Sequence, residues 1–421
     1  MTELPEIVYD VTVIGGGPSG MMAAIAASET GARVLLLEKN NVLGKKLLIS
    51  GGGRCNVTNN KPNVREMLSV YKADGKFLFS TYMQHGVKET LDWFKERGVD
   101  TVEENEGRLF PVTKQAETIQ QALVQSLADS TVTVISEQMV TGVMKSESGF
   151  EVIIKGAESI KTKRCIVATG GITRPETGST GEGMRWLAAL GHTIVENSFA
   201  LVPLTLSSAW TKELSGLTIP DCKLTLTADG TKHSSHAGKI LFTHVGVTGP
   251  TILNMSKTVG DLLEYAEVVI KLDLFPGKDP AAMDQILRDA FTADINKKVR
   301  NALGQLIPIA LAKAVLHECG IDDETKCHSV TRAERIKLGQ YLRAIPLPVS
   351  GLLGKDKAVI SAGGVSKAEV DFKTMESKIL PGLYVTGDIL DVNRPSGGYS
   401  LQLSWSTGAV AGEWAGKAVI K

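Results

Sequence analysis

Residues 10–38 read DVTVIGGGPSGMMAAIAASETGARVLLLE, two apolar runs separated by a glycine-rich turn and a stretch of small residues. Residues 10–14 and residues 32–37 have the β-branched and aliphatic composition of buried strands. Residues 21–28 between them are typical of a helix that packs closely, and Gly31 ends that helix. The stretch therefore predicts one βαβ unit, the building block of a parallel sheet.

The turn of this unit carries a dinucleotide fingerprint. Gly15 allows a tight turn out of the strand, Gly17 lets the backbone approach a pyrophosphate, and Gly20 lets the helix pack close to the sheet. The start of the helix offers free N–H groups and a positive dipole end to phosphates. Glu38 lies 18 residues beyond Gly20, where a carboxylate can accept hydrogen bonds from a ribose. A carboxylate would repel a 2′-phosphate, so the pattern favours FAD or NAD over NADP.

The length and composition of the chain argue against several other classes of function. A chain of 421 residues predicts two or three domains, and a formal net charge of zero gives no support to a nucleic-acid or membrane-surface role. Five scattered cysteines without a Cys-x-x-Cys pair indicate a reducing cytoplasm and argue against a dithiol flavoenzyme. No apolar run is long enough to span a bilayer, and no signal peptide is expected before the first strand.

Three further segments are typical of contacts with a cofactor. Residues 51–59, GGGRCNVTN, combine glycines with an arginine and polar side chains, and the buried strand at 165–169 breaks into Thr169-Gly170-Gly171. Near the C-terminus, the strand at 382–386 ends on Gly387-Asp388, and Gly397-Gly398 precedes a helix of small residues. An acid after a strand can bond ribityl hydroxyls, and a helix start can face the flavin. Two distant segments that converge on one dinucleotide favour FAD over NAD. The glycines at 178–183 follow no clear strand and do not favour a separate NAD site.

Changes in composition divide the chain into three predicted parts. Residues 1–199 and 352–421 form a discontinuous FAD-binding domain of the Rossmann-like, glutathione-reductase-like α/β class. Residues 200–274 and 343–351 form an inserted β-rich domain, because short β-like runs alternate there with turns. Residues 275–342 are rich in Ala, Leu and Lys with helical periodicity and form a helical inserted subdomain.

Taken together, the motifs resemble the bacterial FAD-dependent flavoprotein family that includes aminoacetone oxidase and the BaiN-type flavoproteins, many of them labelled NAD(P)/FAD-dependent oxidoreductases. The resemblance covers nearly the whole chain. It rests on residues 13–20, on Lys45-Lys46, on SGGGRCNVTN at 50–59, on ALVPL at 200–204, on FTHVGVTGP at 242–250, on TMESK at 374–378 and on Gly397-Gly398-Tyr399.

The resemblance implies an FAD fold with β and helical insertions, and it extends the set of expected cofactor-binding residues. Together with the residues assigned from the motifs, this set is Gly15, Gly17, Pro18, Ser19, Gly20, Glu38, Lys39, Lys45, Lys46, Ser50, Gly52, Gly53, Arg54, Asn56, Val140, Thr169, Gly170, Gly387, Asp388, Gly398, Tyr399, Ser400 and Leu401. The chain departs from the family pattern, which usually has Glu at Asp388, Asn at Ser400 and an acid–glycine pair at Asn393-Arg394. Arg394 adds a charge near the expected flavin.

Catalytic residues are not identified by these patterns. His244 lies in a glycine-rich turn and is a weak catalytic candidate beside the alternative of a structural histidine. Cys55 could lie near the flavin face or be a packed small residue. His233 and His236 are three apart without a third ligand, so a surface turn is favoured over a metal site.

We therefore expect an FAD-dependent oxidoreductase that acts on a small organic substrate, without nucleic-acid or membrane partners and without a metal. It would be either an oxidase or a reductase with NAD(P)H as a transient electron donor. The alternative is a non-catalytic FAD-bound binding or redox-sensing protein. The sequence leaves the substrate and the oligomeric state open.

Overall fold

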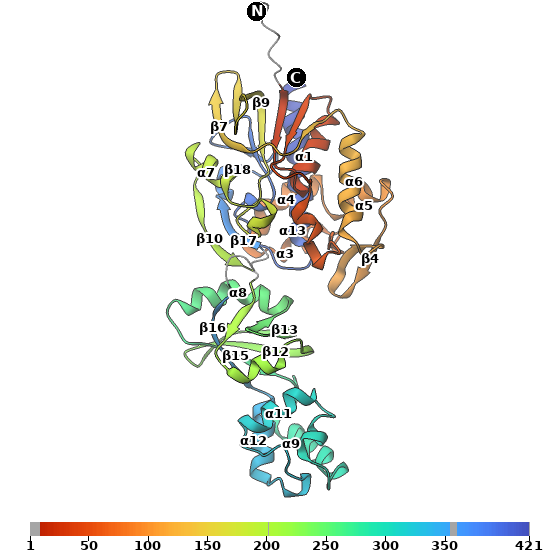
Figure 1. Ribbon diagram of the computed structural model, residues 1–421, viewed down its shortest axis with the longest axis vertical. Coiled ribbons are helices and arrows are strands. Elements are labelled where there is room, and N and C mark those ends of the chain that lie inside the picture. The colour runs from red at the N-terminus through yellow and green to blue at the C-terminus, as the bar shows by residue number, and fades with distance from the viewer. Residues whose placement is uncertain (1–8, 201, 354–359, 421) are drawn as a thin grey trace, which may run out of the picture. The chain divides into compact units, whose positions relative to one another are not determined.

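The chain forms two compact units in a computed structural model that describes residues 9–200, 202–353 and 360–420 (Figure 1). The first unit contains the described residues up to 199 and from 360 onward, and the second contains those between 200 and 353. The second unit is therefore an insertion within the first. Two paired strands, β10 (Ile194–Ala200) and β17 (Ile360–Val365), flank the insertion in the sequence.

The first unit is built on a nine-stranded mixed sheet with the order β18-β19-β20-β9-β1-β2-β6, to which the hairpin of β7 and β8 is attached through β9. The strands from β20 to β6 run parallel, with Val13 opposite Leu36 and Ile166. Their bounds are β1 Tyr9–Ile14, β2 Val34–Leu37, β6 Thr133–Ile135, β7 Val140–Ser146, β8 Gly149–Ile154, β9 Ile160–Val167, β18 Val370–Asp371, β19 Glu376–Ser377 and β20 Leu383–Val385. The predicted βαβ unit and the α/β class are confirmed.

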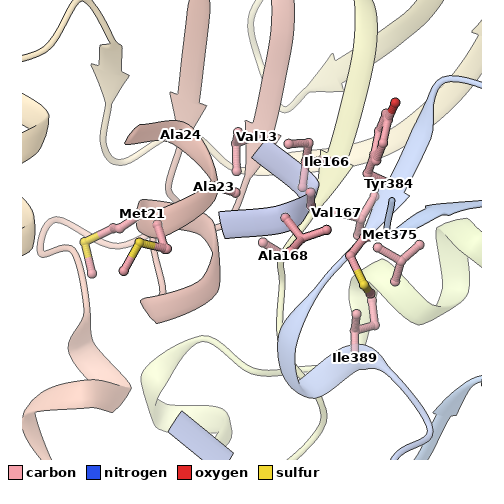
Figure 2. Packing of buried hydrophobic residues seen from close by; sticks show 14 of the residues in the cluster. Val13, Met21, Ala23, Ala24, Ile166, Val167, Ala168, Met375, Tyr384 and Ile389 are labelled. Carbon is pink, nitrogen blue, oxygen red and sulfur yellow. The ribbon is translucent and has the colours of Figure 1, made fainter. Parts of the chain in front are cut away.

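The core of this unit lies where the central strands meet two helices, α1 (Pro18–Ser28) and α13 (Tyr399–Ile420). Figure 2 shows Val13 and Ile166 on neighbouring strands, close to Ala23 and Ala24 of α1. The other helices are α2 Lys45–Leu48, α3 Val64–Ser69, α4 Gly75–Gln84, α5 Val87–Glu96, α6 Ala116–Ala128 and α7 Glu182–Ala189. A small sheet, in the order β3-β5-β4, is made of Thr58–Asn59, Arg108–Pro111 and Thr101–Glu104.

A row of glycines lets α13 lie against α1. A Cβ atom at Gly412 would stand 2.1 Å from the carbonyl oxygen of Ala23, and one at Gly408 would stand 2.4 Å from that of Ser19. A Cβ atom at Gly416 would stand 2.3 Å from the Thr30 hydroxyl oxygen. These distances leave no room for a side chain, so the composition of the last helix is set by helix–helix contact.

The second unit contains a closed barrel of antiparallel strands in the order β11-β14-β13-β12-β15-β16. The strands are β11 Leu204–Leu206, β12 Thr218–Ala228, β13 Thr231–Thr243, β14 Gly246–Thr248, β15 Val268–Asp273 and β16 Ile345–Leu352. Closure pairs every strand on both sides and removes exposed edges. The helices between β15 and β16 are α9 Pro280–Ala293, α10 Val299–Leu303, α11 Ile309–Glu318 and α12 Arg332–Leu342.

One helix lies within the segment expected to be β-rich. Helix α8 (Pro250–Leu263) starts with proline after Gly249 and buries Ile252, Met255, Val259 and Leu262 on one face. One hydrophobic cluster includes residues of both the barrel and helices α9 to α12. The division of the insertion into separate β and helical parts stays a prediction.

Substitution of Gly412 tests the contact between the two helices. Glycine-to-alanine changes in exposed helices stabilise by up to about 1 kcal/mol. At this position we expect G412A to lower the free energy of unfolding by about 1–3 kcal/mol, because the methyl group would overlap the Ala23 carbonyl. Urea unfolding followed by circular dichroism measures the change. A409S, which adds one atom at a half-buried position of the same helix, is the control. A G412A variant as stable as the wild type would show that the helices are not in close contact.

Candidate functional site

The first turn of the βαβ unit has the geometry expected of a phosphate-binding loop. Gly15 has a φ of +108°, and a Cβ atom there would stand 2.6 Å from the Ala168 carbonyl oxygen. A Cβ atom at Gly20 would stand 1.8 Å from the Gly15 carbonyl oxygen. These two glycines are therefore required by the protein's own packing.

Gly17 differs from its neighbours. It caps α1 with a φ of −79°, which any residue can adopt, and a Cβ atom there would have no protein atom within 4 Å. The helix begins at Pro18, so the N–H groups of its first turn have no partner within the helix and are available to a ligand. The open space beside Gly17 suits a pyrophosphate.

Glu38 is fixed at the end of β2 beside this turn. Its Oε2 accepts a hydrogen bond of 2.7 Å from the Gly16 N–H, and its Oε1 accepts from the Asn40 backbone and side-chain nitrogens at 2.7 and 2.6 Å. A carboxylate has about four acceptor positions, so one is left for a ribose hydroxyl. Lys39 instead pairs with Glu182 at 2.5 Å.

Two other expected residues lie near this end of the site. The Gln138 N–H donates to the Glu38 carbonyl oxygen at 2.9 Å, and Val140 begins β7 two residues further on. Thr169 carries a buried hydroxyl that has no hydrogen-bond partner among the described residues, and Gly170 follows it with a φ of +73°. A Cβ atom at Gly183 would stand 2.1 Å from this hydroxyl oxygen, so the Thr169 side chain lies against the start of α7, and its contact with a cofactor stays a prediction.

The C-terminal segment meets the first turn directly. Gly387 has a φ of +80°, and a Cβ atom there would stand 2.4 Å from the Ser19 hydroxyl oxygen. Asp388 follows, and its Oδ2 lies 3.4 Å from the Lys46 Nζ, which also donates to Thr173 Oγ1 at 3.0 Å. The predicted convergence of two distant segments is thus present in the geometry.

The start of α13 is held by the strand that follows the glycine-rich loop. Asn56, with its amide oriented to satisfy its neighbours, accepts a hydrogen bond from the Gly398 N–H at 2.9 Å. The Trp405 indole donates to the Val57 carbonyl at 2.9 Å, and the Thr58 hydroxyl donates to Gln402 Oε1 at 2.6 Å. Tyr399, Ser400 and Leu401 form the first turn of this helix.

Other expected residues are directed elsewhere or make local contacts. Arg54 pairs with both carboxylate oxygens of Glu104 at 3.1 Å and stacks 4.3 Å from the Phe110 ring centroid. Lys45 is exposed, and the Ser50 hydroxyl donates to the Leu47 carbonyl. Gly52 and Gly53 have φ values of +70° and +81°, so they shape the loop. Contacts of these residues with a cofactor stay predictions.

Comparison with known proteins agrees with this geometry. The family model described as HI0933-like protein Rossmann domain matches residues 9–414. The chain belongs to this family.

Relatives of the HI0933-like chain match it over nearly its whole length. It is 30% identical to the 3-dehydro-bile acid delta(4,6)-reductase of Clostridium scindens, over 96% of this chain and 98% of that protein. It is 29% identical to the ribosomal RNA dihydrouridine synthase of Escherichia coli, over 95% and 96% of the two chains.

Solved flavoenzymes share the fold. A flavocytochrome c3 fumarate reductase matches with a TM-score of 0.54 and 16% identity, over 100% of this chain and 80% of that chain. The 3-ketosteroid delta1-dehydrogenase of Sterolibacterium denitrificans matches with a TM-score of 0.56 and 13% identity, over 98% and 100%. The HI0933-like chain is an FAD-dependent oxidoreductase, and FAD as its cofactor is confirmed.

The other candidate reactive side chains of this family member are one buried cysteine and three exposed histidines. Cys55 is fully buried, and burial raises the pKa of its thiol to about 12, so it is not a thiolate near neutral pH. His244 is exposed between β13 and β14, and His233 and His236 are exposed on β13. The described residues hold no group of three or more metal-ligating side chains, and none of their helices is long and apolar enough to cross a membrane.

Sequence reasoning missed several residues that shape the site. Asn40 and Thr173 bond two of the predicted cofactor residues, and Gln402 anchors α13 through a network that includes Thr90 and Ser406. Asn40 directly follows the predicted Glu38-Lys39 pair, which was an available signal. The partners of Gln402 lie more than 300 residues away or one helical turn on, and no local pattern shows them.

Substitution of Gly17 separates cofactor binding from folding. G17A adds one methyl group in open space, so we expect the free energy of unfolding of the apoprotein to change by less than about 0.5 kcal/mol. The FAD dissociation constant should rise at least tenfold, about 1.4 kcal/mol, because the methyl group occupies the phosphate position. Fluorescence titration with FAD measures the affinity. A26S, on a partly exposed face of α1, is the control, and unchanged FAD affinity in G17A would exclude this turn as the phosphate site.

Proposed function

We propose that this protein is an NAD(P)H-dependent reductase of a carbon–carbon double bond conjugated with a carbonyl group. The proposal is supported by the contact of the Gly387-Asp388 segment with the first glycine turn, which together form the predicted FAD site. It is also supported by two reductive relatives that align with nearly the whole chain. The names of these relatives, a 3-dehydro-bile acid delta(4,6)-reductase and a ribosomal RNA dihydrouridine synthase, both indicate reduction of such a bond.

The proposed reaction consumes one NAD(P)H, one proton and one molecule of the conjugated substrate. When bound, FAD would supply the redox chemistry, taking up a hydride from NAD(P)H and passing one on to the carbon β to the carbonyl. An acid or water donates a proton to the α carbon. The substrate thereby gains two hydrogens, and NAD(P)⁺ is released. This chain holds the dinucleotide with Glu38 and the Gly17 turn, and it presents the start of α13 to the second half of the cofactor. Cys55 remains a neutral thiol, which supports electron transfer without a dithiol relay.

We propose a small conjugated carbonyl compound as the substrate and the cytoplasm as the location. The zero formal net charge gives no electrostatic attraction toward RNA, and all five cysteines are free and buried. Uracil within RNA is the second candidate, because the similarity to the Escherichia coli enzyme covers 95% of this chain.

The first experiment follows flavin absorbance without oxygen. We expect NADH or NADPH to bleach the flavin band and a conjugated enone to restore it, while G17A, measured at the same protein concentration, shows little flavin signal. Recovery with a uridine-containing RNA, and not with enones, would establish the second candidate. Bleaching by small amines but not by nicotinamides would mean an oxidase, and no bleaching would mean a non-catalytic FAD protein. Either of the last two results would overturn the proposal.

A further inference from the structure

Arg394 is a buried cation within the FAD-binding unit. Its side chain is 0% exposed, and its guanidinium donates to Asp388 Oδ1 at 2.6 Å, to the Val392 carbonyl at 2.6 Å and to the Ser400 hydroxyl at 3.3 Å. Burying a charge is costly unless partners satisfy it. Each of the three guanidinium nitrogens therefore has a hydrogen-bond partner, which fixes the group in one orientation.

The group formed by Lys46, Asp388, Arg394 and Ser400, here called the Asp388 cluster, holds more positive than negative charge. Burial opposes ionisation of Asp388, but Arg394 and Lys46 outweigh it and hold the pKa of this carboxyl below its usual value. The aspartate is therefore charged at neutral pH and neutralises only one of the two cations. The two cations differ in exposure, because the Arg394 side chain is fully buried and the Lys46 side chain is 26% exposed.

The position of the cluster relates it to the cofactor. Asp388 follows Gly387, which contacts Ser19 at the dinucleotide turn. Ser400 belongs to the first turn of α13, whose N-terminal end carries the positive end of the helix dipole. Arg394 bonds both residues, so its charge lies between the phosphate turn and the start of α13.

We propose that Arg394 raises the reduction potential of the bound flavin by placing a buried positive charge within its site. Two-electron reduction to the anionic form adds negative charge to the flavin ring, and a cation shielded from water favours that form. The proposal depends on FAD binding and not on the substrate proposed above. It assigns a role in the redox step to a residue that is not among the predicted cofactor ligands.

Two substitutions that change the net charge of the Asp388 cluster in opposite directions test the proposal. R394Q keeps a side-chain donor for Asp388 but removes a cation, whereas D388N removes the anion. We expect R394Q to lower the equilibrium constant for two-electron flavin reduction at least tenfold, a shift of about 30 mV to more negative potential. D388N should shift the potential in the positive direction. Spectroelectrochemical titration with FAD in excess measures the potentials, and FAD titration measures affinity separately.

Two controls distinguish electrostatics from a structural role. R394K keeps the charge and should stay within about threefold of the wild-type constant, about 14 mV for a two-electron couple. R65Q removes an exposed charge of α3 in the same unit and should leave the potential unchanged. A structural role for Arg394 would weaken FAD binding in both R394Q and D388N without shifting their potentials in opposite directions.

The result remains decisive if one variant fails to bind FAD. When R394Q loses the cofactor, a positive shift in D388N supports the proposal, and an unchanged or negative value overturns it. When both variants bind FAD, equal potentials or shifts of the same sign overturn it. Failure of the enone reaction would not affect these measurements, because they need only the bound flavin.

Discussion

The close contact between α1 and α13 is the constraint on which the FAD-binding unit depends. The first helix of the chain and the last one approach until only glycine fits at Gly408 and Gly412. This approach brings Gly387 against Ser19 and so places Asp388 beside the phosphate turn. Without it, the N-terminal turn would remain an ordinary nucleotide-binding loop, and the C-terminal acid would have no defined place.

A buried polar network makes the second half of the site equally well defined. Gln402 is fully buried and bonds the Thr58 hydroxyl, the Gly86 carbonyl and the Thr90 hydroxyl. Hydrogen bonds between buried groups are costly to break, because each lost partner leaves an unsatisfied polar atom. The start of α13, which is predicted to face the cofactor, is therefore anchored from several segments and does not rely on the loop before it.

The sequence predicted the parts of this structure that depend on local patterns. The βαβ unit, the glycines of its turn, Glu38 and the convergence of Gly387-Asp388 with that turn all follow from short motifs, and the structure has them in place. Helix α8 was missed because a proline-started helix interrupts a run of strands. The charge balance around Arg394 was missed as a functional feature because it depends on Lys46 and Asp388, which are 342 residues apart. Contacts of that kind appear only once the chain is folded.

The order of the elements along the chain has a consequence for biosynthesis. Strand β1 and helix α1 are synthesised before the inserted unit, whereas α13, Tyr399–Ile420, is synthesised after it. Domains generally fold as units as they emerge from the N-terminus, so the inserted barrel and helices are complete before their host domain is. The nascent chain therefore does not have both halves of the predicted cofactor site until the inserted unit has been made and α13 has followed it. Completion of that site is a late step in the synthesis of this part of the chain.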